Sequence, residues 1–461
     1  MSGCECFCWN RRSEDYDPLQ PQPFSLPSPI PEWPPGRGFA TGKICLGEIE
    51  VVAITKFERI CNLTPLHGKS KGVTFYRPEE IPDGFCILGH YCQPEDEPLR
   101  GYLLVAREVT TTGHCHCDSK SFSPALIRPI GYELICSTDS HRGGCGYIWL
   151  PKTPSGYKAM GFVVTDKPDE PGLDDIRCVR ADLTETCEVV DMILESDSIF
   201  SKDFFKIYNM RPRKRGMLGK GVAVGTFWCT SYHSNGDELD IACLKNLDST
   251  LYAMPNLDQI HALVNHYGPT IFFHPDEVYM PSSVPWFFKN GALLCRPGKV
   301  MGEPIDSRGS NLPCGGKNDG EYWIDLPVGD EERNYLKCGN IESAELYVHV
   351  KPALGGTFTD IVMWVFCPFN GPATLKVGLM NIKLDKIGEH VSDWEHFTLR
   401  LSNFNGELWS VYFSQHSGGE WVNVSDLEFI EGNKAIVYSS NVVMQVSHIL
   451  GATFRGLQCL G

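Results

Sequence analysis

The sequence lacks the long apolar run that a membrane-spanning helix needs. No stretch approaches the roughly 18 to 20 uninterrupted apolar residues of such a helix, and the N-terminus has no apolar core of a secretory signal. We therefore expect a cytoplasmic chain without a transmembrane segment. Positive charge is also scarce, because 41 Lys and Arg face 57 Asp and Glu, for a net charge of −16. This balance argues against nucleic acid as a partner, since little basic surface is available to neutralise phosphates.

Ordinary catalytic motifs are missing as well. The sequence has no Gly-rich phosphate loop, no G-x-S-x-G turn and no nucleophile with an evident base, so we expect no enzyme. Glycine and proline are abundant, with 45 and 32 residues. They separate short apolar runs, a pattern that predicts a mainly β protein with few short helices.

Composition divides the chain into four segments. Residues 1–40 carry eight prolines between Pro18 and Pro35 and few aliphatic side chains, which predicts a disordered tail. Residues 41–250 contain repeats, residues 251–440 have a different pattern, and residues 441–461 form a divergent tail.

The first residues also offer a candidate modification site. Cys4, Cys6 and Cys8 lie beside Phe7 and Trp9, a pattern that could accept S-acylation. The alternative is an unstructured end with reactive thiols.

An internal repeat emerges when the glycines are aligned. Residues 82–89 and 154–161 both read Pro-x-Gly-aromatic followed by a second glycine, and residues 221–228 suggest a degraded third copy. We expect each copy to form one small antiparallel sheet. Three such sheets around a pseudo-threefold axis would share a core, so we predict a β-prism-like domain, with a β-sandwich or a propeller fragment as competitors.

Two clusters in this half have a chemistry of their own. Residues 114–117 alternate His and Cys, a crowded pattern for a structural zinc site. Residues 211–215 are a basic run that could hold a phosphate or an anionic lipid head group, or could be a solvated loop.

The second half combines one helix with longer strands. The spacing of apolar residues predicts a helix over 256–266. Strands are expected at 345–350, 361–367, 395–401 and 408–413, which favours a β-sandwich-like domain.

The sharpest candidate site in this half is His390-x-x-Asp393-Trp394-Glu395, with His416 further on. On an extended strand Asp393 and Glu395 point to one face and Trp394 to the other. The two carboxylates could face a cleft and hold Ca²⁺ or Mg²⁺ with His390 or His416, while the indole packs inside. The alternative is that both carboxylates cap turns and pair with Arg400 or Lys386.

Several motifs together carry a resemblance to a known family. They lie at residues 267–277, 281–287, 322–325, 364–370 and 390–396. They resemble the vacuolar protein sorting-associated protein 62 family, in its plant form, from about residue 40 to Ser440. The resemblance implies peripheral endomembrane or vacuolar trafficking without naming a ligand. Beyond Ser440 the sequence departs from the family pattern, so we expect a truncated or alternative product.

The acidic motif has a second resemblance. His390, Asp393, Trp394 and Glu395 are similar to part of the Gly-His-Arg-His-Asp-Trp-Glu motif of the necrosis-inducing cytolysin family, although Ser392 replaces its second histidine. In that family the acidic residues help hold a cation beside a head-group site. The resemblance implies a β-sandwich with a shallow polar cleft.

Three classes of function remain open. The leading expectation is a non-catalytic adaptor, or a binder of anionic lipid or glycolipid head groups, that works with trafficking proteins in vacuolar or endosomal sorting. It would be cytoplasmic and peripheral on endomembranes. The alternatives are a metal-dependent hydrolase using Asp393, Glu395 and His416, and a membrane-damaging defence protein.

Overall fold

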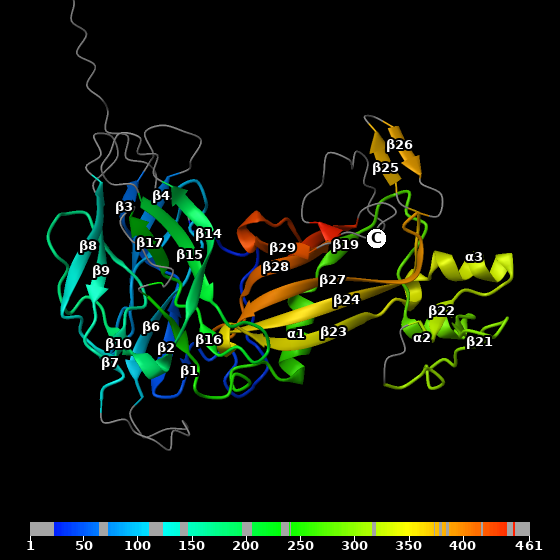
Figure 1. Ribbon diagram of the computed structural model, residues 1–461, viewed down its shortest axis with the longest axis horizontal. Helices are drawn as coiled ribbons and strands as arrows, with labels where there is room; N and C mark the ends of the chain where they lie inside the picture. Colours follow the sequence, from blue (N-terminus) through cyan, green and yellow to red (C-terminus); the bar gives the residue numbers. More distant parts are fainter. Residues whose placement is uncertain are drawn as a thin grey trace, which may run out of the picture.

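The computed structural model describes most of the chain. The described residues are 23–63, 72–109, 123–138, 146–195, 205–231, 239, 241–315, 320–372, 374–377, 380–383, 387–415, 418–439 and 446–447. Their fold is mainly β, as predicted, with three α-helices in the described part. The candidate acylation site and the His/Cys cluster at 114–117 lie outside the described residues. In Figure 1 the repeats occupy one end of an elongated molecule and the second half extends away from them.

The repeat region contains three copies of one strand pattern. The first copy has β1 (Ile44–Cys45), β2 (Ile49–Ile54), β3 (Phe57–Leu63), β4 (Val73–Pro78), β5 (Tyr91–Pro94) and β6 (Leu103–Glu108). The second has β7 (Leu126–Ile127), β8 (Gly131–Thr138), β9 (Gly146–Lys152), β10 (Tyr157–Lys158), β11 (Val163–Thr165) and β12 (Cys178–Arg180). The third has β13 (Thr184–Glu185), β14 (Cys187–Glu195), β15 (Phe205–Pro212), β16 (Gly221–Val222), β17 (Phe227–Ser231) and β18 (Cys243–Lys245).

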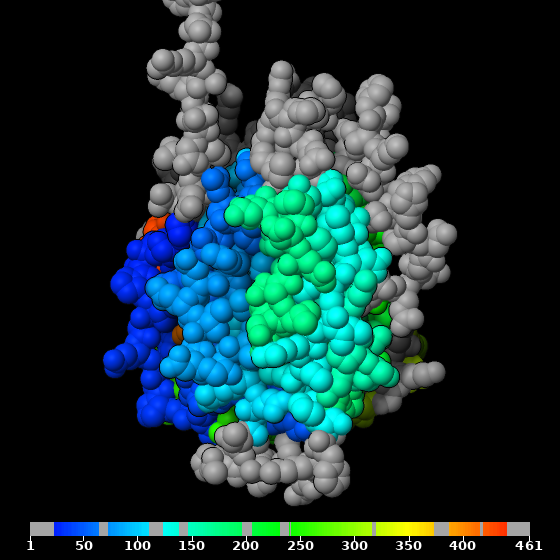
Figure 2. Space-filling view, turned by 90° about the vertical axis from the view of Figure 1, so that its left-hand side faces the viewer, coloured from blue at the N-terminus to red at the C-terminus, as the bar shows by residue number. Residues whose placement is uncertain are grey.

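Each copy forms two three-stranded sheets, not the single sheet expected from the sequence. The meanders β3-β4-β5, β8-β9-β11 and β14-β15-β17 form one set, and β1-β2-β6, β7-β12-β10 and β13-β18-β16 form the other. The extra sheet arises because the last strand of each copy returns to pair with the strand before the meander. Its third strand is β1 in the first copy, whereas β10 and β16 in the other copies pair with the last strand. End-on, the first copy (blue) and the second (cyan) lie side by side (Figure 2).

The third copy, degraded in sequence, is a full copy in structure. Gly89, Gly161 and Gly225 each lie two residues before the last meander strand, at β5, β11 and β17. A Cβ on Gly89 would lie 3.0 Å from the Cα of Gly161 and 2.9 Å from the Thr226 side chain, and a Cβ on Gly161 would lie 2.5 Å from the Thr226 side chain. Because only glycine allows this contact, the repeated glycine marks the place where the copies meet.

The proline-rich segment from residue 23 onward is ordered, so the prediction of a disordered tail is wrong for residues 23–40. Phe24, Trp33 and Phe39 pack against the hydrophobic core of the second half. The Trp33 indole donates a hydrogen bond to the Asn405 carbonyl at 2.9 Å. The backbone N–H of Ser28 donates to the Asn433 side chain at 2.8 Å. A few aromatic contacts therefore hold a segment whose average composition resembles a disordered one.

The second half is built on one long sheet. It contains α1 (Leu257–Tyr267), β19 (Thr270–Phe272), α2 (Val284–Lys289), β20 (Leu293–Cys295), β21 (Glu303–Pro304), β22 (Trp323–Asp325), α3 (Asp330–Cys338), β23 (Leu346–Ala353), β24 (Phe358–Asn370), β25 (Thr374–Val377), β26 (Met380–Lys383), β27 (His390–Ser402), β28 (Leu408–Gln415), β29 (Gly418–Asn423), β30 (Phe429–Ile430), β31 (Lys434–Ser439) and β32 (Val446–Ser447). Five strands form the antiparallel sheet β23-β24-β27-β28-β29. All four strands predicted from the sequence belong to it.

The predicted helix is also present. It begins after Asn256, which forms a capping box with Gln259. Leu263 and Tyr267 are fully buried in the core between α1, β31 and one face of the long sheet. This two-layer packing matches the sandwich-like expectation.

The other face of the long sheet is covered at its far end only. There α2 and α3 pack Phe287 and Leu336 against Phe366 and Phe369 of β24. Among the described residues, no helix covers the end of this face nearest the repeats. This end faces the third copy (Figure 1).

The two halves are joined by a packed interface at the base of that open region. The Arg100 guanidinium forms an ion pair with Glu407 at 2.6 Å and donates to the Leu408 carbonyl at 3.1 Å. Tyr102 contacts the rings of Phe358 and Trp409, with centroids 5.5 and 5.3 Å apart. The two side chains of this ion pair are only 11% and 14% exposed, so the halves share a partly buried polar contact beside the aromatic one.

Candidate functional site

Strand β27 carries the residues predicted as a site, and its two faces differ. Asp393 and Glu395 share a face with Phe397, and Trp394 faces the other way, toward Tyr347 and Phe366. The predicted alternation of faces is therefore present. The carboxylates, however, lie on the side of the sheet that carries the hydrophobic core.

Glu395 is buried, with 9% of its surface exposed. Its carboxylate accepts a hydrogen bond from the Ser414 hydroxyl at 2.7 Å. Burial, the largest cause, raises the pKa of Glu395 to about 7; the Ser414 hydrogen bond opposes this rise and the charge of Asp393 adds to it. Near neutral pH this carboxyl is therefore partly protonated.

Asp393 lines a small pocket at the end of the core. Its side chain lies 3.8 Å from the His390 ring nitrogen. Glu277, Tyr279 and Cys367 line the same pocket. Burial raises the pKa of the Cys367 thiol well above its usual range, and the carboxylates of Asp393, Glu277 and Glu395 raise it further.

These groups do not assemble a complete cation site. Across the described ranges, no group of three or more His, Cys, Asp or Glu side chains is placed to hold a metal ion. His416 lies outside the described residues. The Ca²⁺ or Mg²⁺ expected from the sequence therefore stays a prediction. Of the two basic partners in the alternative, Arg400 binds Asp360 instead, and Lys386 lies outside the described residues.

Trp394 is not packed inside as expected. Its indole is 41% exposed and contacts the rings of Tyr347 and Phe366 at 5.2 and 4.9 Å. The reason is that α2 and α3 cover only the end of this face. The open cleft therefore lies on the indole side of the sheet and not on the carboxylate side.

The uncovered part of that face forms one wall of a cleft of about 770 Å³ between the two halves of the molecule. This volume falls within the range of roughly 300 to 1,000 Å³ that is usual for small-molecule sites. Four aromatic rings cross the wall on four adjacent strands, namely Trp364 (β24), His396 (β27), Tyr412 (β28) and Trp421 (β29).

The four rings form a continuous row of ring contacts, called the aromatic stack below, in which His396 and Tyr412 are stacked and the other two pairs are tilted by 44° and 55°. Trp364 and His396 have centroids 4.3 Å apart, His396 and Tyr412 are parallel at 5.7 Å, and Tyr412 and Trp421 are 5.4 Å apart. Gly419 makes the stack possible, because a Cβ there would overlap the Tyr412 ring. Trp421 is 42% exposed and so offers an aromatic face to a ligand.

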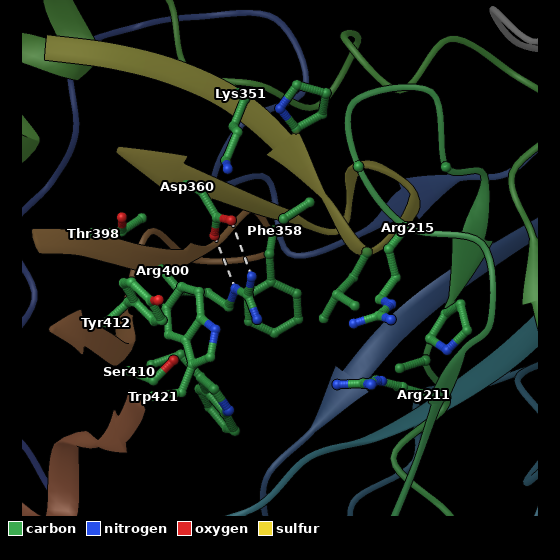
Figure 3. Close-up of a pocket in the computed structure, with 18 of the residues that line it drawn as sticks. Arg211, Arg215, Lys351, Phe358, Asp360, Thr398, Arg400, Ser410, Tyr412 and Trp421 are labelled. Atoms are coloured by element: carbon green, nitrogen blue, oxygen red, sulfur yellow. Dashed lines mark hydrogen bonds and ion pairs between the residues drawn. The ribbon is translucent and has the colours of Figure 1, made fainter. Parts of the chain in front are cut away.

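A buried ion pair fixes the floor beside the stack. Arg400 binds the Asp360 carboxylate with two hydrogen bonds of 2.8 and 3.0 Å, and its guanidinium lies 3.9 Å from the centroid of Trp421 (Figure 3). Lys351 lies beside this pair on the wall of the cleft. Burial lowers the pKa of His396, and the charge of Lys351 lowers it further, so the ring is neutral.

The opposite wall is basic and comes from the third repeat copy. Figure 3 shows Arg211 and Arg215 pointing across the cleft toward the aromatic wall. Both are held by Glu188, at 2.8 and 3.5 Å. In total the lining has five Arg and Lys side chains against two Asp, in a chain with a net charge of −16. Glu188 and Glu185, just outside the lining, pair with Arg211, Arg215 and Lys214, so the cleft keeps a small excess of positive charge in an acidic protein.

Sequence reasoning missed this site because its members lie on six strands and a turn. The basic run at 211–215 stands out in the sequence, and four of its five residues line the cleft. The aromatic stack left a weaker signal, since Trp364, His396, Tyr412 and Trp421 each alternate with residues that are buried on the core face. Only the strand order brings them together.

Comparison with known proteins identifies the family. The profile of vacuolar protein sorting-associated protein 62 matches residues 20–461. The chain belongs to the vacuolar protein sorting-associated protein 62 family. Membership in this family suggests a role in vacuolar protein sorting. No curated protein matches the sequence. No helix in the described part of the chain is long and apolar enough to cross a membrane.

Solved structures show distant similarity only. GNIP1Aa from Chromobacterium piscinae is 16% identical with a TM-score of 0.34, over 48% of this chain and 40% of its own. This chain thus spans less than half the length of GNIP1Aa. Necrosis and Ethylene inducing Protein 2, from the causal agent of cocoa's Witches Broom disease, is 15% identical with a TM-score of 0.20, over 39% of this chain and 76% of its own. TM-scores this low support no functional conclusion.

Proposed function

We propose that this member of the family is a non-catalytic binder of anionic head groups that acts in vacuolar protein sorting from the cytoplasmic side of endomembranes. The observation that carries the proposal is the cleft in which a continuous aromatic stack faces a basic wall. Aromatic faces suit the apolar faces of a sugar or inositol ring, and Arg and Lys suit phosphate groups. The ligand class is therefore a phosphorylated cyclic polyol, either free or as the head group of a lipid.

The chemistry of the cleft favours binding over catalysis. Asp360 is held in an ion pair with Arg400, and its side chain is only 5% exposed. The His396 ring is stacked between Trp364 and Tyr412. These groups are held in place by their neighbours, which suits a preformed recognition surface more than a proton-transfer site.

A second hollow of similar size is a weaker candidate. It lies at the base of the first repeat copy and includes Lys43, Arg107 and Glu50. Glu50 binds both Lys43 and Arg107, at 3.1 and 2.5 Å. The lining of this hollow has four Arg and Lys side chains against three Asp and Glu, so its excess of basic over acidic side chains is smaller than that of the cleft lining.

Calorimetric titration of the full chain tests the proposal. The probes are inositol bisphosphates and hexose phosphates, each with its unphosphorylated parent ring. We expect binding of a phosphorylated ring and at least tenfold weaker binding of the parent. Trp421→Ala should weaken binding at least tenfold, or about 1.4 kcal/mol, because it removes the exposed end of the stack. Trp323→Ala is the matched control, since Trp323 is also exposed, at 47%, but lies on β22 outside the cleft.

The outcomes separate clearly. Binding that survives Trp421→Ala unchanged would remove the cleft as the site. Failure of every phosphorylated ring to bind would remove the proposed ligand class. A divalent cation at Asp393 stays a prediction from the sequence, and the same titration in the presence of chelator tests it.

A further inference from the structure

The turn that follows the basic wall has an unusual surface. Residues 211–220 contain five Arg and Lys and no acidic residue. At its tip lie two apolar side chains, Met217 and Leu218, which are 54% and 95% exposed. A leucine this exposed gains free energy from any apolar surroundings, and the positive charge around it favours an anionic surface.

The turn holds this tip in a defined position. Gly216 takes a left-handed conformation with φ 89°, and the N–H of Gly219 donates to the Gly216 carbonyl at 3.0 Å. The two ends are anchored to the fold, because the N–H of Arg213 donates to Thr186 at 3.0 Å and the Lys220 carbonyl accepts from Asn246 at 2.8 Å. Little backbone entropy is lost when a turn already held in this way docks on a partner.

We infer that the turn at residues 211–220 docks the protein on an anionic bilayer, with Met217 and Leu218 inserted among the lipids and the basic side chains at the head groups. An apolar tip ringed by Lys and Arg is the arrangement that binds at the interface of a negatively charged leaflet. This inference goes beyond the cleft, because it requires only lipid charge and an apolar interior and no particular head group.

Docking in this way would bring the cleft to the membrane. Lys214 and Arg215 belong to the turn and also line the cleft. A bilayer that receives the Met217–Leu218 tip therefore lies close to the cleft and its basic wall. The turn would supply affinity for anionic bilayers in general, while the cleft would select the head group.

The chain contains a natural control for this idea. A second turn exposes Val300 and Met301, at 101% and 70%. Its basic neighbours Arg296 and Lys299 both pair with Glu303. This turn has an equally apolar tip but only these two basic residues, whereas the turn at residues 211–220 carries Arg213 and Lys220 in addition to three basic residues that are paired with Glu188 or Glu185. It lies in the second half beside β21.

Sedimentation of the full chain with vesicles tests the inference. The vesicles are phosphatidylcholine alone, or phosphatidylcholine with about one third phosphatidylserine. We expect binding to the anionic vesicles only, with a loss of at least tenfold in M217S/L218S and no loss in V300S/M301S. Arg213→Glu, an exposed position outside the cleft lining, should weaken binding severalfold, and added salt should do the same.

A second readout reports the depth of the tip. Leu218→Trp should be quenched by brominated lipid in anionic vesicles, measured as the difference from the wild type. Unchanged binding by M217S/L218S, equal binding to neutral vesicles, or absence of binding to both vesicle types would overturn the inference. None of these outcomes touches the cleft, because Trp421→Ala in the soluble titration tests that site separately.

Discussion

The two faces of the long sheet use the same five strands for opposite purposes. The core face carries Phe397, Leu399 and Leu401. Next to them on the same strand lies Glu395, which is buried and accepts a hydrogen bond from Ser414. The other face carries aromatic and basic side chains that stay open to a cleft. In this molecule the conspicuous acidic motif therefore belongs to the closed face, and the less conspicuous face has the properties of a binding site.

The largest expected effect is on the core face. Leu399→Ala should lower the free energy of unfolding by about 3 to 4 kcal/mol, because Leu399 is fully buried and its removal leaves a cavity. Urea denaturation followed by tryptophan fluorescence measures the change. Leu218→Ala, at a 95% exposed leucine, should leave stability nearly unchanged. Equal losses in the two variants would contradict the assignment of the core.

The next effect concerns Glu395 and pH. Its folded-state pKa is about 7, above the usual value of 4.5. The folded protein therefore binds the extra proton, and this stabilisation is fully present below about pH 4.5 and lost as the pH rises through about 7. We expect the contribution of Glu395 to the free energy of unfolding of the wild type to fall by about 2 kcal/mol between these two pH values.

Comparison of Glu395→Gln with the wild type isolates that loss. The variant cannot ionise at this position, so its stability relative to the wild type should rise between pH 5 and pH 8. Glu420→Gln, at an exposed position on β29, is the control and should follow the wild type. The same pH dependence in Glu395→Gln and in the wild type would show that the carboxyl is not buried as described.

The smallest effect on stability is expected on the open face. Trp421→Ala should cost less than about 1 kcal/mol, since the ring is 42% exposed and its main contacts are Tyr412 and Arg400. Urea denaturation next to Leu399→Ala gives the comparison directly. A loss close to that of Leu399→Ala would mean that the stack is a part of the core, and it would weaken the case for a ligand.

Much of the fold was predictable from local pattern. Alternation predicted the strands, helical spacing predicted α1, and the repeated glycines predicted two copies and indicated the third. The second sheet of each copy was missed because it joins strands about 50 residues apart along the chain. Residues 23–40 were missed because composition averages over a segment, whereas Phe24, Trp33 and Phe39 act through single contacts.

The candidate site was predictable in part. Alternation placed Asp393 and Glu395 on one face correctly, but the same alternation continues to Phe397, Leu399 and Leu401. Because residues two apart on a strand share a face, the apolar residues that follow already indicated that the carboxylates lie on the core side. The aromatic stack could not be read from one strand, because each strand contributes a single ring. The plant form and the shortened C terminus stay predictions.

The N-terminal segment has a practical consequence for work with this protein. Because the segment is rich in proline, it would be a common choice for removal when the protein is expressed. Such a truncation would strip Trp33 and Phe39 from a core that they help to close, and would leave Asn433 without its contact to Ser28. Shortened versions that begin after residue 40 should therefore be prone to aggregate, whereas a label attached ahead of residue 23 would spare every one of these contacts.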